Sequence, residues 1–206
     1  MKSPLDILDW STLDAATRDA VLRRPVQRNA ADLLERARNI VTDVRARGDY
    51  ALRDYTSTLD GVHLDSFGVS DAEFAAAEAA LTPVQRAALE RAIDTITRFH
   101  ELQTLPPLRL ETAPGVVCER ITVALESVGL YVPAGTAPLP STALMLAIPA
   151  SIARCPVRIM CTPPRPDGSA DPAVLVAARL CGIRKVFKVG GAQAVAAMAY
   201  GTASVP

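Results

Sequence analysis

The sequence has few of the residues on which metal and acid–base chemistry depend. Its 206 residues include 2 histidines and 4 cysteines, with no Cys-x-x-Cys or His-x-x-x-His spacing of the kind that indicates a zinc site. It contains neither a G-x-G-x-x-G fingerprint nor a G-x-x-x-x-G-K-[ST] phosphate loop. Its formal net charge is +0, and general nucleic-acid and anionic-membrane binders attract phosphates with a summed positive field. We therefore expect neither kind of partner.

No segment has the pattern of a leader or of a membrane span. The N-terminus lacks the apolar stretch of a signal peptide. The uncharged run over residues 127–153 is interrupted by four prolines, and the run that begins at Val189 opens with two glycines and turns polar at Gly201. With 50% hydrophobic residues, the composition predicts a soluble, globular, cytoplasmic protein whose cysteines are reduced structural thiols set among apolar residues.

Charge and proline divide the chain into two regions. Residues 1–105 carry 13 basic and 17 acidic residues, a balance of −4, whereas residues 106–206 carry 9 basic and 5 acidic residues, a balance of +4. Of the 16 prolines, 3 precede residue 106 and 16 − 3 = 13 follow residue 105. We predict a helical region over 1–105 that forms part of a first domain, and a differently built region over 106–206.

The first region has the apolar periodicity of helices. Apolar residues recur every three or four positions over residues 33–44, and Gly48 fits the end of that helix. A shorter helix is expected over residues 49–59, and Ser70 with Glu73 forms a capping-box pattern ahead of another. The signals ahead of a last, longer helix are Thr82, Pro83 and Gln85.

The second region alternates β-rich runs with helical segments. Alternation of this kind predicts right-handed crossovers and a doubly wound parallel sheet, so we expect an α/β fold with a Rossmann-like region, incomplete at this length. The expected strands are 116–123, 128–132, 157–161 and 185–189. The expected helices run from Ser141 as cap towards Ala153 with a kink or interruption at Pro149, over 173–181, and from Gly190-Gly191 through Ala199.

Two loops leave predicted strands and enter predicted helices. They cover residues 131–138 and 189–193, and ligands of open parallel sheets bind where such loops converge. If both strands are parallel, Tyr131 and Gln193 lie on one edge, where an aromatic ring and an amide would suit a nucleotide cofactor. Alternatively, the glycines serve a tight turn and the tyrosine anchors an edge.

No residue is predicted to be catalytic or to bind a metal. His63 lies in a polar turn and His100 follows the apolar face of a helix, so both are better explained as structural or solvated residues. Ser141 is most simply a helix cap, with no histidine beside it in the sequence. The carboxylates cluster in the helical region, where solvated helix faces account for them.

The two loops belong to a longer set of stretches that resemble one enzyme family. Together these stretches closely resemble the histidinol dehydrogenase family over essentially the whole chain, with one departure at Ala134, where the family usually has glycine. The matching stretches are 44–49, 51–53, 99–100, 105–107, 114–116, 128–133, 141–147, 149–153, 186–194 and 201–206.

The resemblance implies an activity and two site residues. It implies an oxidoreductase of histidine biosynthesis that needs NAD and zinc, oxidises L-histidinol to L-histidine through the aldehyde, and works as an intertwined homodimer. It also implies that Tyr131 and Gln193 contact NAD, the same two residues that the sheet-edge argument selects. The family's asparagine contact to NAD, its zinc ligands and its catalytic Glu-His pair match no residue of this sequence and would follow Pro206.

We therefore expect a truncated form that is inactive by itself and exposes part of its apolar core. Its partner would be a second copy or the complementary C-terminal half. The alternative is a non-catalytic assembly or dimerisation module, or a remnant of the enzyme.

Overall fold

The computed structural model describes residues 7–23, 30–134 and 137–206, and their contacts form two compact units. The units are Met1–Arg36 and Ala37–Pro206. In the first, a 3-10 turn, η1 (Trp10–Thr12), precedes the short helix α1 (Ala15–Leu22). Asp9 and Asp14 accept hydrogen bonds from the first backbone N–H groups of these elements, as acidic N-caps do. The sequence pattern did not indicate α1.

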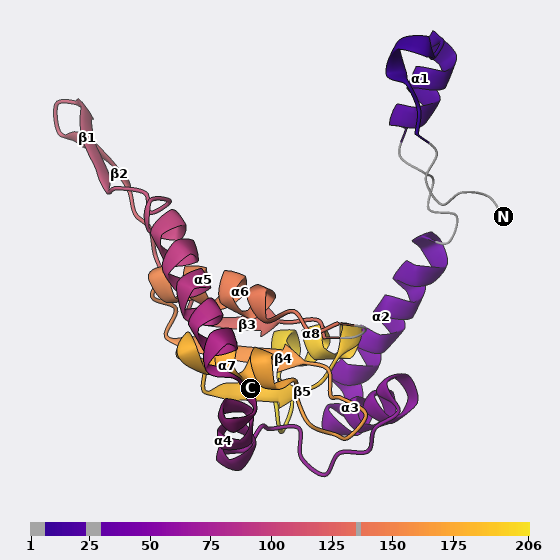
Figure 1. The fold of residues 1–206 in the computed structure, drawn as a ribbon. Helices are drawn as coiled ribbons and strands as arrows, with labels where there is room; N and C mark the ends of the chain where they lie inside the picture. The colour runs from indigo at the N-terminus through magenta and orange to yellow at the C-terminus, as the bar shows by residue number, and fades with distance from the viewer. Residues whose placement is uncertain (1–6, 24–29, 135–136) are drawn as a thin grey trace. The chain divides into compact units, whose positions relative to one another are not determined.

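The second unit has the α/β organisation that the sequence predicts (Figure 1). Three parallel strands lie in the order β3-β4-β5, and α6 and α7 connect them in sequence. The strands are β3 (Ser127–Tyr131), β4 (Val157–Thr162) and β5 (Lys185–Lys188). The helices of this unit are α2 (Ala30–Arg47, which begins in the first unit), α3 (Asp49–Tyr55), the π-helix η2 (Thr56–Asp60), α4 (Asp71–Ala80), α5 (Pro83–Glu101), α6 (Pro140–Ile152), α7 (Pro172–Leu180) and α8 (Gly191–Tyr200).

Alternate residues of the sheet face two separate cores. Met160 and Val186 point to a core formed with α4, α6 and α7, whereas Ile159, Cys161 and Phe187 belong to a core formed with α2, α3 and α8. This alternation follows from the two-residue period of a strand and gives a helix–sheet–helix arrangement.

The helical region and the sheet share both cores. Phe74 and Ala77 of α4 are buried with the α6 and α7 residues, and Val44 and Leu52 are buried with α8. Packing is therefore continuous across Pro106, and the domain division at residue 105 stays a prediction.

Close packing of α8 on β3 requires a glycine in the strand. A Cβ atom at Gly129 would lie 2.8 Å from the Cβ of Met198, closer than two such atoms approach in proteins. Gly129 therefore lets the helix that follows β5 lie directly on the first strand of the sheet.

Both capping boxes are confirmed. The side-chain oxygens of Ser70 and Thr82 each accept a hydrogen bond from the backbone N–H three residues later. In turn, the side-chain oxygens of Glu73 and Gln85 accept from the backbone N–H of the cap residue. Pro83 occupies the first turn of α5. These motifs are local, which is why the sequence predicts them well.

Three local predictions are wrong. Ser141 is not the cap of α6, because the helix already begins at Pro140 and follows Leu139, which makes no side-chain cap bond. Of the two alternatives expected at Pro149, the interruption is wrong, because the helix continues to Ile152, and the kink stays a prediction. The strand expected over 116–123 ends at Arg120 and pairs antiparallel with an unpredicted strand, so it lies outside the parallel sheet. These two strands are β1 (Leu108–Ala113) and β2 (Val116–Arg120).

The outer edge of β5 is covered by an earlier segment of the chain, Phe67–Val69. The N–H of Val69 donates to the carbonyl of Val186 over 2.9 Å, and the N–H of Lys188 donates to the carbonyl of Phe67 over 2.8 Å. This antiparallel bridge places the start of α4 beside the end of β5.

Apolar side chains are exposed on the β1–β2 hairpin and along α5. Every residue of both hairpin strands is exposed, and no residue of α5 is fully buried. The large exposed side chains are Val84, Phe99, Leu108, Leu110, Val116 and Val117. Whether the chain also exposes part of its apolar core stays a prediction. Within the described ranges, no helix is both long and apolar enough to span a bilayer.

Candidate functional site

The carboxyl ends of the three parallel strands form one rim. The register pairs Tyr131 with Cys161 and Thr162 with Lys188, so the loops that follow β3, β4 and β5 leave the sheet together. This is the edge at which open α/β sheets bind ligands. In the first predicted loop, Gly135 and Thr136 lie outside the described residues.

Tyr131 joins the first loop to the last helix. Its hydroxyl accepts a hydrogen bond from the backbone N–H of Gly191 over 2.9 Å, across 60 positions of sequence. The prediction that the two loops meet at one edge of the sheet is therefore confirmed. The bond uses one of the N–H groups that the first turn of a helix leaves without a partner inside the helix.

A residue with a side chain would not fit at either of the two glycines that start α8. A Cβ atom at Gly190 would lie 2.8 Å from the Cβ of Pro163, and Gly191 has a φ of +62°, which side-chain-bearing residues rarely adopt. A Cβ atom at Gly191 would also lie 2.6 Å from Oε1 of Gln193. The two glycines therefore let Pro163 and the side chain of Gln193 pack directly against this turn.

Gln193 is buried beside these glycines. Its exposed fraction is 1%, and its Oε1 atom has no hydrogen-bond partner among the described residues. The hydroxyl of Thr162, at the end of β4, is likewise buried without one. Buried polar atoms normally have hydrogen-bond partners, so these two oxygens at one rim are unusual and remain available to further donors.

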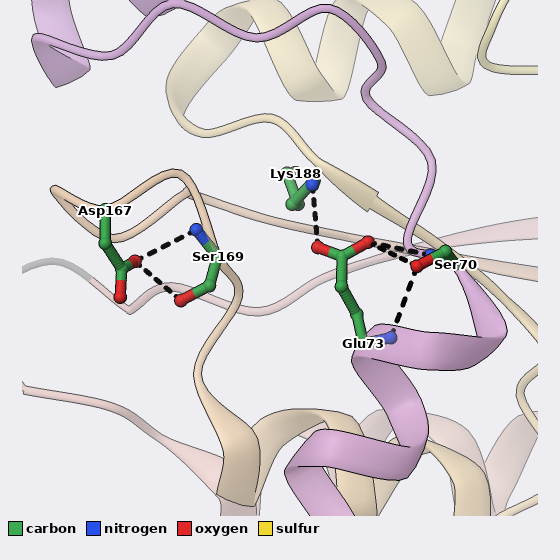
Figure 2. Close-up of polar contacts among 5 residues, drawn as sticks. All are labelled: Ser70, Glu73, Asp167, Ser169 and Lys188. Carbon is green, nitrogen blue, oxygen red and sulfur yellow. Dashed lines mark hydrogen bonds and ion pairs between the residues drawn. The ribbon is translucent and has the colours of Figure 1, made fainter.

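A half-buried ion pair supports the end of β5. Nζ of Lys188 donates to Oε1 of Glu73 over 2.7 Å, and the other carboxylate oxygen of Glu73 accepts from the backbone N–H and hydroxyl of Ser70 (Figure 2). Burial alone would raise the pKa of Glu73, but the bonds from Lys188 and Ser70 outweigh it and hold that pKa below its ordinary value. One glutamate thus fixes both the start of α4 and the residue two positions before Gly190.

Figure 2 also shows a local contact in the loop between β4 and α7. The carboxylate of Asp167 accepts hydrogen bonds from the backbone N–H and the hydroxyl of Ser169, at 3.0 and 2.6 Å. The two bonds hold the pKa of Asp167 below its ordinary value. This carboxylate is therefore satisfied within its own turn.

A cavity of about 380 Å³ opens on the same rim. Its walls come from the π-helix η2, from the loop after β3 and from the loop after β4. Its lining residues are Leu59, Asp60, Ala134, Pro138, Pro163, Pro164, Arg165, Pro166 and Asp171. Sequence reasoning missed it, because η2 is distant in sequence from both loops.

Neither histidine lies at this rim. The ring of His63 hydrogen-bonds to the hydroxyl of Ser57 at 3.1 Å, and Nδ1 of His100 lies 2.7 Å from Oε1 of Gln103. Within residues 7–23, 30–134 and 137–206, no group of three or more His, Cys, Asp or Glu side chains is placed to hold a metal ion.

The cysteines include buried thiols that resist ionisation. Burial raises the pKa of Cys161 to about 12 and that of Cys181 to about 11, so neither is a thiolate at neutral pH. Cys155 is also buried. The expectation that every cysteine lies among apolar residues is wrong for Cys118, which is exposed on the hairpin strand β2.

Comparison with known proteins gives one consistent result. The family profile described as histidinol dehydrogenase matches residues 22–206. A histidinol dehydrogenase of Xanthomonas euvesicatoria pv. vesicatoria (strain 85-10) is 58% identical over 202 residues, which cover 98% of this chain and 47% of that protein. One from Xylella fastidiosa (strain 9a5c) is 52% identical over the same shares.

A solved structure agrees with these relatives. The crystal structure of histidinol dehydrogenase from Elizabethkingia anophelis matches with a TM-score of 0.87 and 37% identity, over 94% of this chain and 45% of that one. The chain thus spans about half the length of the relatives that it matches, 47% in the case of the Xanthomonas protein.

Proposed function

This chain belongs to the histidinol dehydrogenase family, and we propose that it supplies the NAD-binding part of an oxidoreductase that converts L-histidinol to L-histidine through the aldehyde. The observation that carries the proposal is the meeting of Tyr131 with Gly191 beside the buried, unpartnered amide oxygen of Gln193. Tyr131 and Gln193 are the residues that the family motif associates with NAD. We also propose that the protein acts in the cytoplasm.

The residues at the rim fit a dinucleotide. Apart from the N–H of Gly191, which Tyr131 accepts, the first turn of α8 presents backbone N–H groups that favour an anionic pyrophosphate. The buried oxygen of Gln193 requires a donor, which a ribose or a carboxamide would provide. A bound NAD would supply the hydride acceptor for oxidation of the alcohol. The chain's own residues position it: Tyr131 fixes the turn and Gln193 fixes the ligand's orientation.

We propose that zinc and the acid–base residues of the reaction are not supplied by these 206 residues. The described residues offer no metal-ligand cluster, and the buried thiols at Cys161 and Cys181 stay protonated. We therefore derive no proton or metal step from this chain and expect it to bind NAD without turning over L-histidinol.

Calorimetry and a turnover assay together test this proposal. We expect the purified chain to bind NAD, and Gln193→Ala to weaken binding about tenfold or more because an acceptor at the ligand is lost. Gln103→Ala, at an exposed position away from the rim, is the matched control. With zinc and L-histidinol added, absorbance of reduced cofactor should not rise. Absence of NAD binding would refute the cofactor role, and turnover would refute the proposed inactivity.

A second candidate function is assembly with another copy of this chain. The observation in its favour is the wholly exposed β1–β2 hairpin, whose apolar residues include Leu108 and Leu110. Light scattering should give a dimer that Leu108→Lys with Leu110→Lys converts to a monomer. A monodisperse wild-type monomer at ~100 μM would argue against it, since homodimers with apolar interfaces are stable at that concentration.

A further inference from the structure

We infer that Asp60 binds a ribose hydroxyl of the dinucleotide, and that the cavity beside it receives the adjoining phosphate. The inference rests on the proposed NAD-binding function and adds to it a residue that lies 71 positions before Tyr131 and outside both loops. Three observations support it: the position of Asp60, its missing partner, and the charges around the cavity.

Asp60 lies at the rim of the sheet although it belongs to the helical region. It ends the π-helix η2, and Gly61 follows with a left-handed φ of +70° that turns the chain away. One carboxylate oxygen, Oδ1, lies 3.3 Å from the position that a Cβ of Gly190 would take. The carboxylate is therefore next to the glycine turn that opens α8.

The carboxylate of Asp60 lacks a partner. Its Oδ2 atom is buried and makes no hydrogen bond to any described residue. Burial raises its pKa, with no opposing hydrogen bond or ion pair. An unsatisfied, desolvated carboxylate costs folding free energy, and such costs are concentrated where a ligand later provides the missing donors.

The other two charged residues that line the cavity differ from Asp60: one is a carboxylate whose hydrogen bonds are satisfied, and the other is a cation. Asp171 accepts hydrogen bonds from the N–H groups of Ala173 and Val174 as the N-cap of α7. The remaining charged residue of the lining is Arg165, whose side chain is exposed. The described lining residues therefore include one carboxylate with an unpartnered oxygen and one cation.

This combination selects ribose and phosphate. An ionised carboxylate accepts from neighbouring hydroxyls, which a ribose supplies as a cis-diol, and repels phosphate placed directly on it. The guanidinium of Arg165, on the wall formed by the loop after β4, offers a counter-charge to the phosphate that adjoins the ribose in the ligand. A volume of about 380 Å³ suits one half of a dinucleotide. Both riboses of NAD carry a cis-diol, so either one could donate to Asp60.

Two NAD analogues, each lacking the 2′-hydroxyl of one ribose, test the contact by calorimetry. We expect the wild-type chain to prefer NAD about tenfold over one analogue, and the analogue that is disfavoured identifies the ribose. In Asp60→Asn this preference should fall to within about twofold. Asp65→Asn removes the same charge at an exposed position in the next loop and should leave the preference unchanged.

Thermal melting separates this role from a structural one. Because the raised pKa means that the fold disfavours the ionised carboxylate, Asp60→Asn should melt no lower than wild type at pH 7, whereas loss of a structural contact would lower its melting temperature.

Each outcome decides between the two proposals. Equal affinity of the wild-type chain for NAD and both analogues would overturn the ribose contact without any variant, as would an undiminished preference in Asp60→Asn. Failure of the wild-type chain to bind NAD at all would overturn the proposed function and this inference together.

Discussion

The hydroxyl of Tyr131, the last residue of β3, accepts the backbone N–H of Gly191, the first residue of α8, over 2.9 Å. Since β4 separates β3 from β5 in the sheet, this bond spans the rim from one outer strand to the turn after the other. It fixes the helix N-terminus relative to the loop that follows β3. The geometry of the proposed cofactor site therefore depends on the hydrogen bond of the Tyr131 side chain to the start of α8.

Replacing Tyr131 with phenylalanine should weaken NAD binding while leaving the fold intact. The Gly191 N–H loses its acceptor, and loss of one such bond predicts about a 3- to 10-fold rise in the dissociation constant. Calorimetry measures the change. Tyr50→Phe is the control, because Tyr50 is 74% exposed and makes no contact with the rim. Equal losses in both variants would contradict the role of this bond.

Replacing Glu73 with glutamine should destabilise the protein. Glutamine keeps an oxygen for the Ser70 capping box but leaves the buried ammonium of Lys188 without its counter-charge. Because the pair is partly exposed, we expect a loss of about 1–3 kcal/mol in the free energy of unfolding, measured with urea.

Glu78→Gln on the same helix is the matched control for that loss. Its ion pair with Arg179 is half-exposed and longer, at 3.6 Å, so removing it should cost no more than ~0.5 kcal/mol. Glu73→Gln combined with Lys188→Met should recover part of the stability, since no charge then remains buried alone. Equal losses for Glu73→Gln and Glu78→Gln would contradict the argument.

Strong acid should remove a contact between α3 and the last turn of the chain. Burial pushes the pKa of Asp49 upward, but hydrogen bonds from Ser204 and Thr202 outweigh it and hold the pKa below its ordinary 3.8. A depressed folded-state pKa gives stability that is complete above the unfolded value and is lost as pH falls through the folded one. Ser204→Ala should therefore cost about 1 kcal/mol at pH 7, and this cost should shrink only as the pH falls below 3.8 and through the lower folded-state pKa.

Ser66 provides the control for the pH dependence of Ser204→Ala. Ser66→Ala changes an exposed hydroxyl, and its small effect on urea unfolding should not vary with pH. A pH-independent cost for Ser204→Ala would show that its bonds to the Asp49 carboxylate are not responsible.

Thiol labelling should single out Cys118. It is exposed, whereas Cys155 and Cys161 are buried, and burial raises the pKa values of Cys161 and Cys181 to about 12 and about 11. With Ellman's reagent at pH 8, we expect one fast equivalent, and the others only after denaturation. Cys118→Ser should abolish the fast phase. A fast phase that survives this change would contradict the burial of the other thiols.

The sequence predicted features whose causes are local. The capping pairs Ser70 with Glu73 and Thr82 with Gln85 lie three residues apart, so the pattern contains the whole interaction. Alternation of strands and helices likewise predicted the parallel sheet that places Tyr131 at its rim. Whether Tyr131 and Gln193 bind NAD stays a prediction.

Features set by distant contacts could not be predicted in this way. The partner of Glu73 is Lys188, 115 positions later, and the missing partner of Asp60 becomes evident only when η2 is placed beside Gly190. The hairpin strand β1 was also missed, because its pairing with β2 becomes evident only once the two strands are placed side by side in the fold.

The segment Phe67–Val69 also has a consequence for aggregation. β5 is an edge strand, and an uncovered edge offers its backbone donors and acceptors to any other extended chain. In this protein the edge is closed by the segment that leads directly into Ser70 and Glu73, and Glu73 is held by a residue of β5 itself. Local opening of the start of α4 would therefore expose the strand without unfolding the rest of the sheet. The rate of strand-to-strand aggregation would then depend on this one anchor rather than on global stability.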